Sequence, residues 1–230
     1  MCPKNEHIPV RYVLGEKGIK KIRKYVEEGG YLFAEDWCME DFVEKAFGDY
    51  VSHGTVRSKD ESVNVMPKPG SASHPYLRKI FFRPPKAERG VTVSDTDLDK
   101  IEHKWKIDKE TRTIRVKDDK KVVTLLASSD LAKSDSNNDA VAVTWGVDPV
   151  ATGGKKESSR LTAVATGPEI PQDRQKMTGG RVLYVLSHFG KQDSQVDEFA
   201  LQNLLINFLV EANERRGAYQ PAPQPAGAKK

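Results

Sequence analysis

The sequence has few cysteines and no long hydrophobic run. Cys2 and Cys38 are the only cysteines among 230 residues, too few for a disulfide framework and without the paired spacing of a zinc site. No apolar stretch approaches the roughly 20 residues that cross a bilayer as a helix, so we expect no membrane segment in this chain. The first residues also lack the basic-then-apolar order of a signal peptide, which predicts a cytoplasmic protein if Met1 is the natural start.

The sequence also lacks a strong excess of one charge. Its net charge is +4, and the 30% of residues that are charged mix lysine and arginine with acids along the whole chain. A nucleic-acid-binding surface normally needs clustered basic residues, so we expect no nucleic-acid partner. Residues 153–156 read Gly-Gly-Lys-Lys but lack the spacing and the preceding strand of a phosphate-binding loop. We therefore expect no cofactor.

The best-defined pattern in the chain is a strand followed by a long helix near the C-terminus. Residues 181–186 form an apolar run after two glycines, which is typical of a strand buried on both faces and favours a parallel sheet. Ser194, with Asp197 three residues later, is a helix-capping pattern. The apolar residues that follow predict a largely buried helix ending near Arg216. Residues 217–230 are rich in proline and alanine, and we expect a disordered tail there.

The N-terminal part has the order strand, helix, strand. Residues 8–14 and 31–34 are mostly apolar, and residues 17–28 between them carry an amphipathic helical pattern that ends at Gly29 and Gly30. This order is typical of a right-handed parallel unit. A short helix is expected over residues 39–47.

The middle of the sequence has a different character. Residues 104–107 and 113–116 alternate apolar with polar side chains, and polar turn residues separate them, so we predict a β-hairpin there. We expect residues 50–120 to form a hairpin-rich insertion in one α/β domain that spans residues 8–216. The expected fold is a mostly parallel, flavodoxin-like sheet with helices on both faces.

Three segments together resemble a known superfamily. They are residues 17–36, which contain Gly-Gly-Tyr-Leu-Phe-Ala-Glu-Asp; residues 73–82, which begin Ser-His-Pro-Tyr; and residues 180–205, which contain Gly-Arg-Val-Leu-Tyr-Val-Leu-Ser-His. The combination resembles the class I glutamine amidotransferase-like superfamily. Within that superfamily it is most similar to an uncharacterised bacterial domain family whose members are often exported or membrane-linked.

The resemblance implies the flavodoxin-like sheet and a site on the loops that follow its strands. Amidotransferases of this superfamily carry a nucleophilic cysteine on a glycine-flanked turn, and a histidine with an acidic partner. Cys38 lies near the matching position, but Trp37 and Met39 flank it, and Phe189 and Gly190 follow His188 where the acidic pairing is expected. The catalytic residues therefore do not carry over. Relatives also have a further strand and helix before residue 10, so a missing N-terminal portion would make an exported or membrane-linked parent plausible.

The candidate site consists of the two loops that follow the strands at residues 31–34 and 181–186. Parallel strands bring such loops to one edge of the sheet, where open α/β folds bind ligands. We expect a non-catalytic module that binds a small ligand or a protein partner there. The expected ligand-binding residues are Glu35, Asp36, Trp37, His188 and Gln192.

Three alternatives remain at this point. In the first, Cys38 and His188 form the nucleophile and base of a hydrolase or amidotransferase-like enzyme. In the second, Trp37, Trp105 and Trp145 stack on a sugar, which would make the domain a carbohydrate-associated module. In the third, Glu35 and Asp36 join His188 around a metal ion; adjacent acids are common on loops without any ion, so the expectation is no metal site.

Overall fold

The computed structural model describes residues 14–80, 103–135, 138–148 and 179–218. The strand expected over residues 8–14 lies outside these ranges, apart from Leu14, as does the tail from residue 219 onward. In chain order the elements are α1 (Glu16–Glu27), β1 (Tyr31–Glu35), the π-helical turn η1 (Met39–Val43), α2 (Glu44–Phe47), β2 (Val51–Arg57), β3 (Glu61–Pro67), the 3₁₀ turn η2 (Pro75–Leu77), β4 (His103–Ile107), β5 (Arg112–Val116), β6 (Val122–Ala127), α4 (Ser129–Ser134), β7 (Ala140–Gly146), β8 (Arg181–Val185) and α6 (Gln195–Ala218).

The sheet is mixed, and the expectation of a mostly parallel, flavodoxin-like sheet is wrong. The main path of neighbouring strands is β1-β8-β7-β6-β3-β4, and β5 joins it through β7 and carries β2. Among the described strands, β1 and β8 form the one parallel pair. The other pairs, such as β7 with β8 and β6 with β7, are antiparallel. The chain is therefore α/β only in the general sense that helices cover a sheet.

The predicted hairpin is also wrong in its pairing, although both of its strands exist. β4 pairs with β3, from Val65↔His103 to Glu61↔Ile107, and β5 pairs with β2, as at Val51↔Val116. The two sequence-adjacent strands thus diverge into different parts of a curled, half-barrel sheet. The residues expected to form an insertion contribute directly to that sheet, since β3 also pairs with β6 and β5 with β7.

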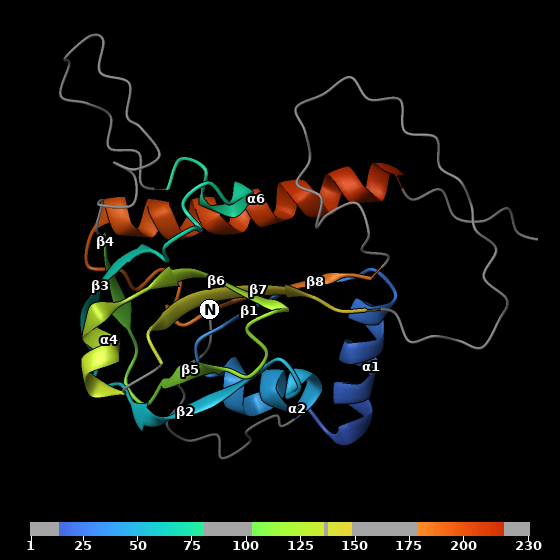
Figure 1. The fold of residues 1–230 in the computed structure, drawn as a ribbon, viewed down its shortest axis with the longest axis horizontal. Helices are drawn as coiled ribbons and strands as arrows, with labels where there is room; N and C mark the ends of the chain where they lie inside the picture. The colour runs from blue at the N-terminus through green and yellow to red at the C-terminus, as the bar shows by residue number, and fades with distance from the viewer. Residues whose placement is uncertain (1–13, 81–102, 136–137, 149–178, 219–230) are drawn as a thin grey trace, which may run out of the picture.

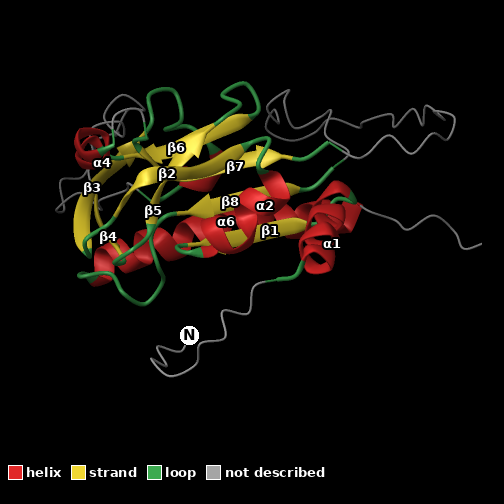
Figure 2. Ribbon diagram, turned by 90° about the horizontal axis from the view of Figure 1, so that it is seen from below, coloured by secondary structure: helices red, strands yellow, loops and turns green. Residues whose placement is uncertain are grey.

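The sheet lies between two unlike layers. The long helix α6 runs along one face, while α1, α2 and the β2–β5 ribbon lie on the other (Figures 1 and 2). The ring of Phe208 on α6 contacts Tyr31 of β1 at 5.3 Å between centroids. On the opposite face, Phe47 and Tyr50 pack against Trp145 of β7 at 5.8 and 5.9 Å. All five residues of β8 are buried between these layers.

These layers explain why the direction of the strands was mispredicted. Burial on both faces makes a strand mostly apolar, as in β8 after Arg181, whichever way its neighbours run. Here a helix covers one face, and the curled ribbon with α1 and α2 covers the other. An apolar run therefore reports burial correctly, whereas strand direction depends on the path of the connections.

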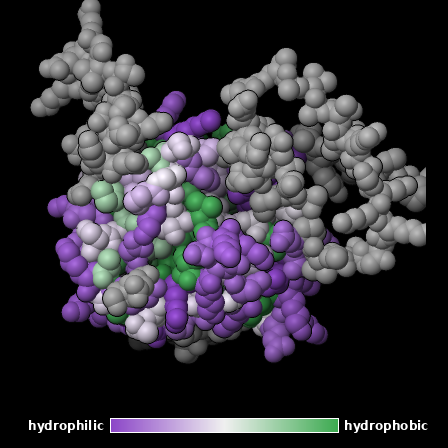
Figure 3. Space-filling view, in the orientation of Figure 1, coloured by the Kyte–Doolittle hydropathy of each residue, from purple (hydrophilic) through white to green (hydrophobic). Residues whose placement is uncertain are grey.

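The helix α6 is less buried than expected. Its core-facing side chains are buried, among them Leu201, Leu204 and Phe208, whereas several apolar side chains on its outer side are about half exposed or more: Val196, Phe199, Ile206, Leu209 and Val210. The helix extends two residues beyond Arg216. None of the helices in the described ranges is both long enough and apolar enough to cross a membrane. The face seen in Figure 3 is mostly hydrophilic, with an apolar area near its centre.

Candidate functional site

The loops after β1 and β8 meet at one edge of the sheet, as predicted. The parallel register runs from Tyr31↔Arg181 to Glu35↔Val185, so the residues after each strand leave on the same side. Asp36 follows β1 directly, and His188 lies three residues after β8. Their side chains approach to 3.3 Å between the Asp36 Oδ2 and His188 Nδ1 atoms.

Asp36 is held by the sheet and not by a flexible loop. Its backbone N–H donates to the Val185 carbonyl at 3.0 Å, and its own carbonyl accepts a hydrogen bond from the Tyr184 hydroxyl. Its φ of 52° lies in the left-handed region, which aspartate tolerates better than most residues. Thr111 donates to its Oδ1 atom. One carboxylate oxygen is therefore fixed by the protein, while Oδ2 points to His188.

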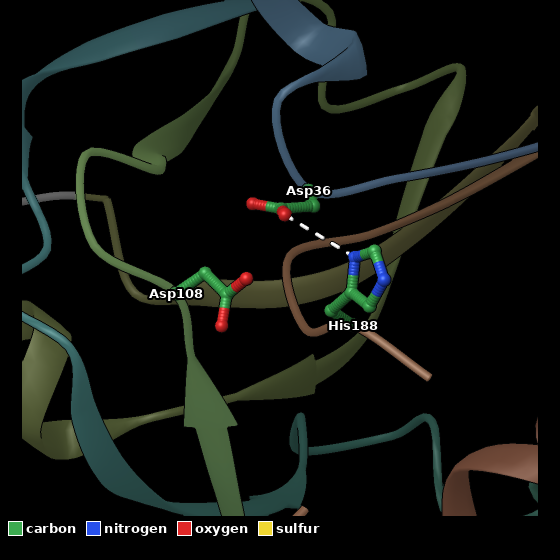
Figure 4. Close-up of side chains that lie close together, drawn as sticks. All are labelled: Asp36, Asp108 and His188. Carbon is green, nitrogen blue, oxygen red and sulfur yellow. Dashed lines mark ion pairs between the residues drawn. The ribbon is translucent and has the colours of Figure 1, made fainter. Parts of the chain in front are cut away.

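A third residue, Asp108, enters from the end of β4. Figure 4 shows Asp36, Asp108 and His188 turned toward a common centre, each from a different strand end. One ligand atom from each lies within 4.8 Å of the other two, and the residues are only 3%, 6% and 8% exposed. The Lys191 ammonium forms an ion pair with Asp108 Oδ2. Lys191 lies in the same loop after β8 as His188. The cluster is therefore formed by residues that follow β1, β4 and β8.

Two atoms at the centre of this cluster are buried without a hydrogen bond. Asp36 Oδ2 and His188 Nδ1 face each other, yet neither has a hydrogen-bonding partner among the residues that the structure describes. Glu35 adds a second carboxylate, with Oε1 at 3.6 Å from His188 Nδ1. Its other oxygen accepts the Phe189 N–H at 3.4 Å. Buried polar atoms are normally satisfied, so this arrangement is unusual and calls for an explanation.

Burial dominates the electrostatics of the two acids after β1. Removal from water raises the pKa of Asp36 to about 6, against the opposing effects of the Thr111 hydrogen bond and of His188 and Lys191. The same desolvation raises the pKa of Glu35 above its ordinary value. A carboxyl whose charge is costly in the folded protein gains from any group that neutralises it. The site therefore favours added positive charge.

The remaining predicted residues lie at the rim and hold it together. The Gln192 amide accepts from the Lys106 N–H at 2.9 Å and donates to Ser187 Oγ and the His188 carbonyl, each at 2.9 Å. This ties the loop after β8 to β4. The Trp37 indole N–H donates to the Lys109 carbonyl at 3.1 Å, and the Lys191 ammonium lies 5.3 Å from the Trp37 ring centroid. Gln192 and Trp37 thus position the loops.

Cys38 belongs to a different environment. It precedes the turn Met39–Val43, and its half-buried side chain packs against the hydrophobic core. His188 Nδ1 instead faces the carboxylates of Asp36 and Glu35. The left-handed backbone after β1 falls on Asp36, two residues before the cysteine.

Sequence reasoning missed Asp108, Thr111 and Lys191. The first two were read as turn residues of a hairpin, and that hairpin is not formed. A usable signal was present, because polar residues directly following a strand mark its end, and β4 ends at Ile107. Placing that end beside β1 and β8 required the curled topology, which the sequence pattern does not reveal.

No family model, no curated protein and no solved structure matches the chain. The resemblance to the amidotransferase-like superfamily therefore stays a prediction. A function has to be argued from the cluster itself.

Proposed function

We propose that this chain is a non-catalytic binding module whose ligand presents a positively charged group to the cluster of Glu35, Asp36, Asp108 and His188. The observation that carries the proposal is the pair of buried, facing atoms Asp36 Oδ2 and His188 Nδ1, which lie 3.3 Å apart without a hydrogen bond. A ligand that contacts both would satisfy them. We also propose that the chain is related to the amidotransferase-like superfamily, on the basis of the sequence resemblance alone.

The charge of the site supports a cationic ligand. Three carboxyl groups from Glu35, Asp36 and Asp108 surround one histidine, and the Lys191 ammonium is paired with Asp108. The pKa of Asp36 is raised by burial, so its negative charge is poorly compensated. The Lys191 side chain is 29% exposed, and a long side chain of this kind can turn to solvent when another cation enters.

The two other functional hypotheses have weaker support. Trp105 and Trp145 are only 0% and 1% exposed, so they are core residues and leave Trp37 as the one described tryptophan at the rim for a sugar to stack on. Cys38 packs against the core, and His188 Nδ1 faces carboxylates. This geometry favours binding over thiol chemistry.

Tryptophan fluorescence tests the proposal, because Lys191 lies over the Trp37 ring and should move when a cation enters. We expect n-butylamine, methylguanidine or a divalent metal chloride to change the emission of the protein, and n-butanol to leave it unchanged. The Trp37→Phe variant should lose the response, since Trp105 and Trp145 are buried. A complete lack of response to every cation, or an equal response in Asp36→Asn, would contradict cation binding at this site.

A further inference from the structure

The chemistry of the cluster identifies its ligand more closely than positive charge alone. We infer that Asp36, Asp108 and His188 form a binding site for a divalent transition-metal ion of the zinc type. This inference rests on the proposed function, since it names the class of cation. It depends on the donor atoms, their spacing and the two buried atoms that face each other without a hydrogen bond.

The spacing of Asp36 and His188 suits two ligands of one ion. Metal–ligand bonds of about 2.0–2.2 Å in a tetrahedral zinc site place neighbouring ligand atoms about 3.4 Å apart. Asp36 Oδ2 and His188 Nδ1 are separated by 3.3 Å and make no hydrogen bond. The same two atoms are therefore poorly placed for each other and well placed for a shared ion.

Asp108 supplies the third ligand after a small movement. Its oxygen already lies within 4.8 Å of the other two donor atoms. A carboxylate rotation that moves this oxygen by about 1 Å would bring it to bonding distance of a shared ion. Its present partner is the ammonium of Lys191. The metal ion would replace that ammonium, and the partly exposed lysine would turn toward solvent.

Further residues around the cluster have the roles that metal sites require. Thr111 donates to Asp36 Oδ1 and so fixes the carboxylate while leaving Oδ2 for the ion, as outer hydrogen bonds commonly do around metal ligands. Glu35 Oε1 lies 3.6 Å from His188 Nδ1 and can complete a fourth position. The acids would then balance the positive charge of the ion, which takes the place of the Lys191 ammonium beside Asp108.

The donor set selects among metals. A histidine nitrogen with carboxylate oxygens suits zinc, manganese, iron, cobalt or nickel, whereas magnesium and calcium prefer oxygen ligands alone. We therefore expect zinc binding to be much tighter than magnesium binding. An alkylammonium or guanidinium group would instead use the carboxylates and leave His188 Nδ1 unliganded.

Isothermal titration with zinc chloride tests the inference on the full chain. We expect one zinc ion per chain, and about 100-fold weaker binding in His188→Gln and in Asp36→Asn, since each removes a ligand. Glu35→Gln should weaken binding less, by about tenfold. His53→Gln is the matched control, because His53 lies at the surface near Glu44; it should bind as tightly as the parent chain.

Circular dichroism shows whether each variant is folded. If either Asp36→Asn or His188→Gln fails to fold, the other variant still tests the site. Zinc binding that is unchanged in both variants, or that is no tighter than magnesium binding, would overturn the metal site. If zinc fails but butylamine or methylguanidine still changes Trp37 emission, the metal inference falls and cation binding stands. If none of these cations acts at the site, both fall.

Discussion

Two histidine–aspartate pairs lie within the part of the chain that the structure describes, and they differ in whether their facing atoms are hydrogen-bonded. In the bonded pair, His103 Nδ1 lies 2.9 Å from Asp197 Oδ1 in a hydrogen bond that joins β4 to the first turn of α6. In the unbonded pair, His188 Nδ1 and Asp36 Oδ2 face each other at 3.3 Å without a hydrogen bond. The same two residue types thus serve different purposes.

The surroundings of the bonded pair explain its role. Asp197 also accepts from the Lys104 N–H at 3.3 Å and from the Ser194 hydroxyl, and its own N–H donates to Ser194 Oγ at 3.1 Å. The predicted capping pattern is therefore present, and the pair anchors the start of α6. The two facing atoms of the pair, His103 Nδ1 and Asp197 Oδ1, are hydrogen-bonded to each other, which is the expected state of polar groups that stabilise a fold.

The largest expected difference between the pairs concerns their aspartates. The pKa of Asp36 is raised to about 6 in the folded protein, so the unfolded chain releases this proton first, and the contribution of Asp36 to stability falls as pH rises from about 4 to 6. Asp36→Asn removes that penalty. We expect it to raise the free energy of unfolding by up to about 3 kcal/mol at pH 8, with little change at pH 4.

Urea unfolding at both pH values measures this effect. The charged and titratable groups around Asp36 are Glu35, Asp108, His188 and Lys191. Asp197→Asn is the matched control and should lower stability at pH 8, because it weakens the charge-assisted hydrogen bonds of the bonded pair. Stabilisation by Asp197→Asn, or a loss of stability in Asp36→Asn at pH 8, would remove the distinction between the pairs.

The next difference concerns the histidines. His103→Ala deletes a hydrogen bond and leaves Asp197 without that donor, whereas His188→Ala deletes a ring whose Nδ1 makes no hydrogen bond. We expect the first substitution to cost about 2 kcal/mol more than the second in thermal or urea unfolding. Equal costs would indicate that His188 stabilises the fold as His103 does.

The smallest expected effect is the change in zinc affinity on substitution of Lys191. This lysine neutralises Asp108 beside the unbonded pair. Lys191→Met removes this competing cation, so zinc should bind about tenfold more tightly, a gain of about 1.4 kcal/mol. Lys109→Met removes an exposed positive charge nearby and serves as the control, with an expected change well below tenfold. Titration calorimetry distinguishes the two variants. Weaker zinc binding in Lys191→Met would argue that the lysine assists the ligand.

Sequence patterns predicted the local elements and one half of the site. The strands at β1 and β8, the helices α1 and α6, and the meeting of Asp36 with His188 all follow from apolar periodicity, capping residues and glycines. These features depend on neighbours in the sequence. The parallel direction of β1 and β8 was also correct, and it placed the two loops together.

The rest depends on contacts between distant segments. β4 and β5 are adjacent in sequence and look like a hairpin, yet they pair with β3 and β2 because the sheet curls. That curl brings Asp108 beside Asp36, and no periodic pattern encodes it. The hydrogen bonds of the Gln192 side chain likewise could not be read from its position in a polar loop.

The two pairs should differ above all in ligand binding: the His188–Asp36 pair accepts a ligand, whereas the His103–Asp197 pair does not. Side-chain ¹⁵N NMR spectra of histidine-labelled protein, recorded before and after one equivalent of zinc chloride, test it most directly. We expect the His188 Nδ1 signal to shift on coordination and the His103 signals to stay in place. An unmoved His188 signal, or equal shifts at both histidines, would contradict it.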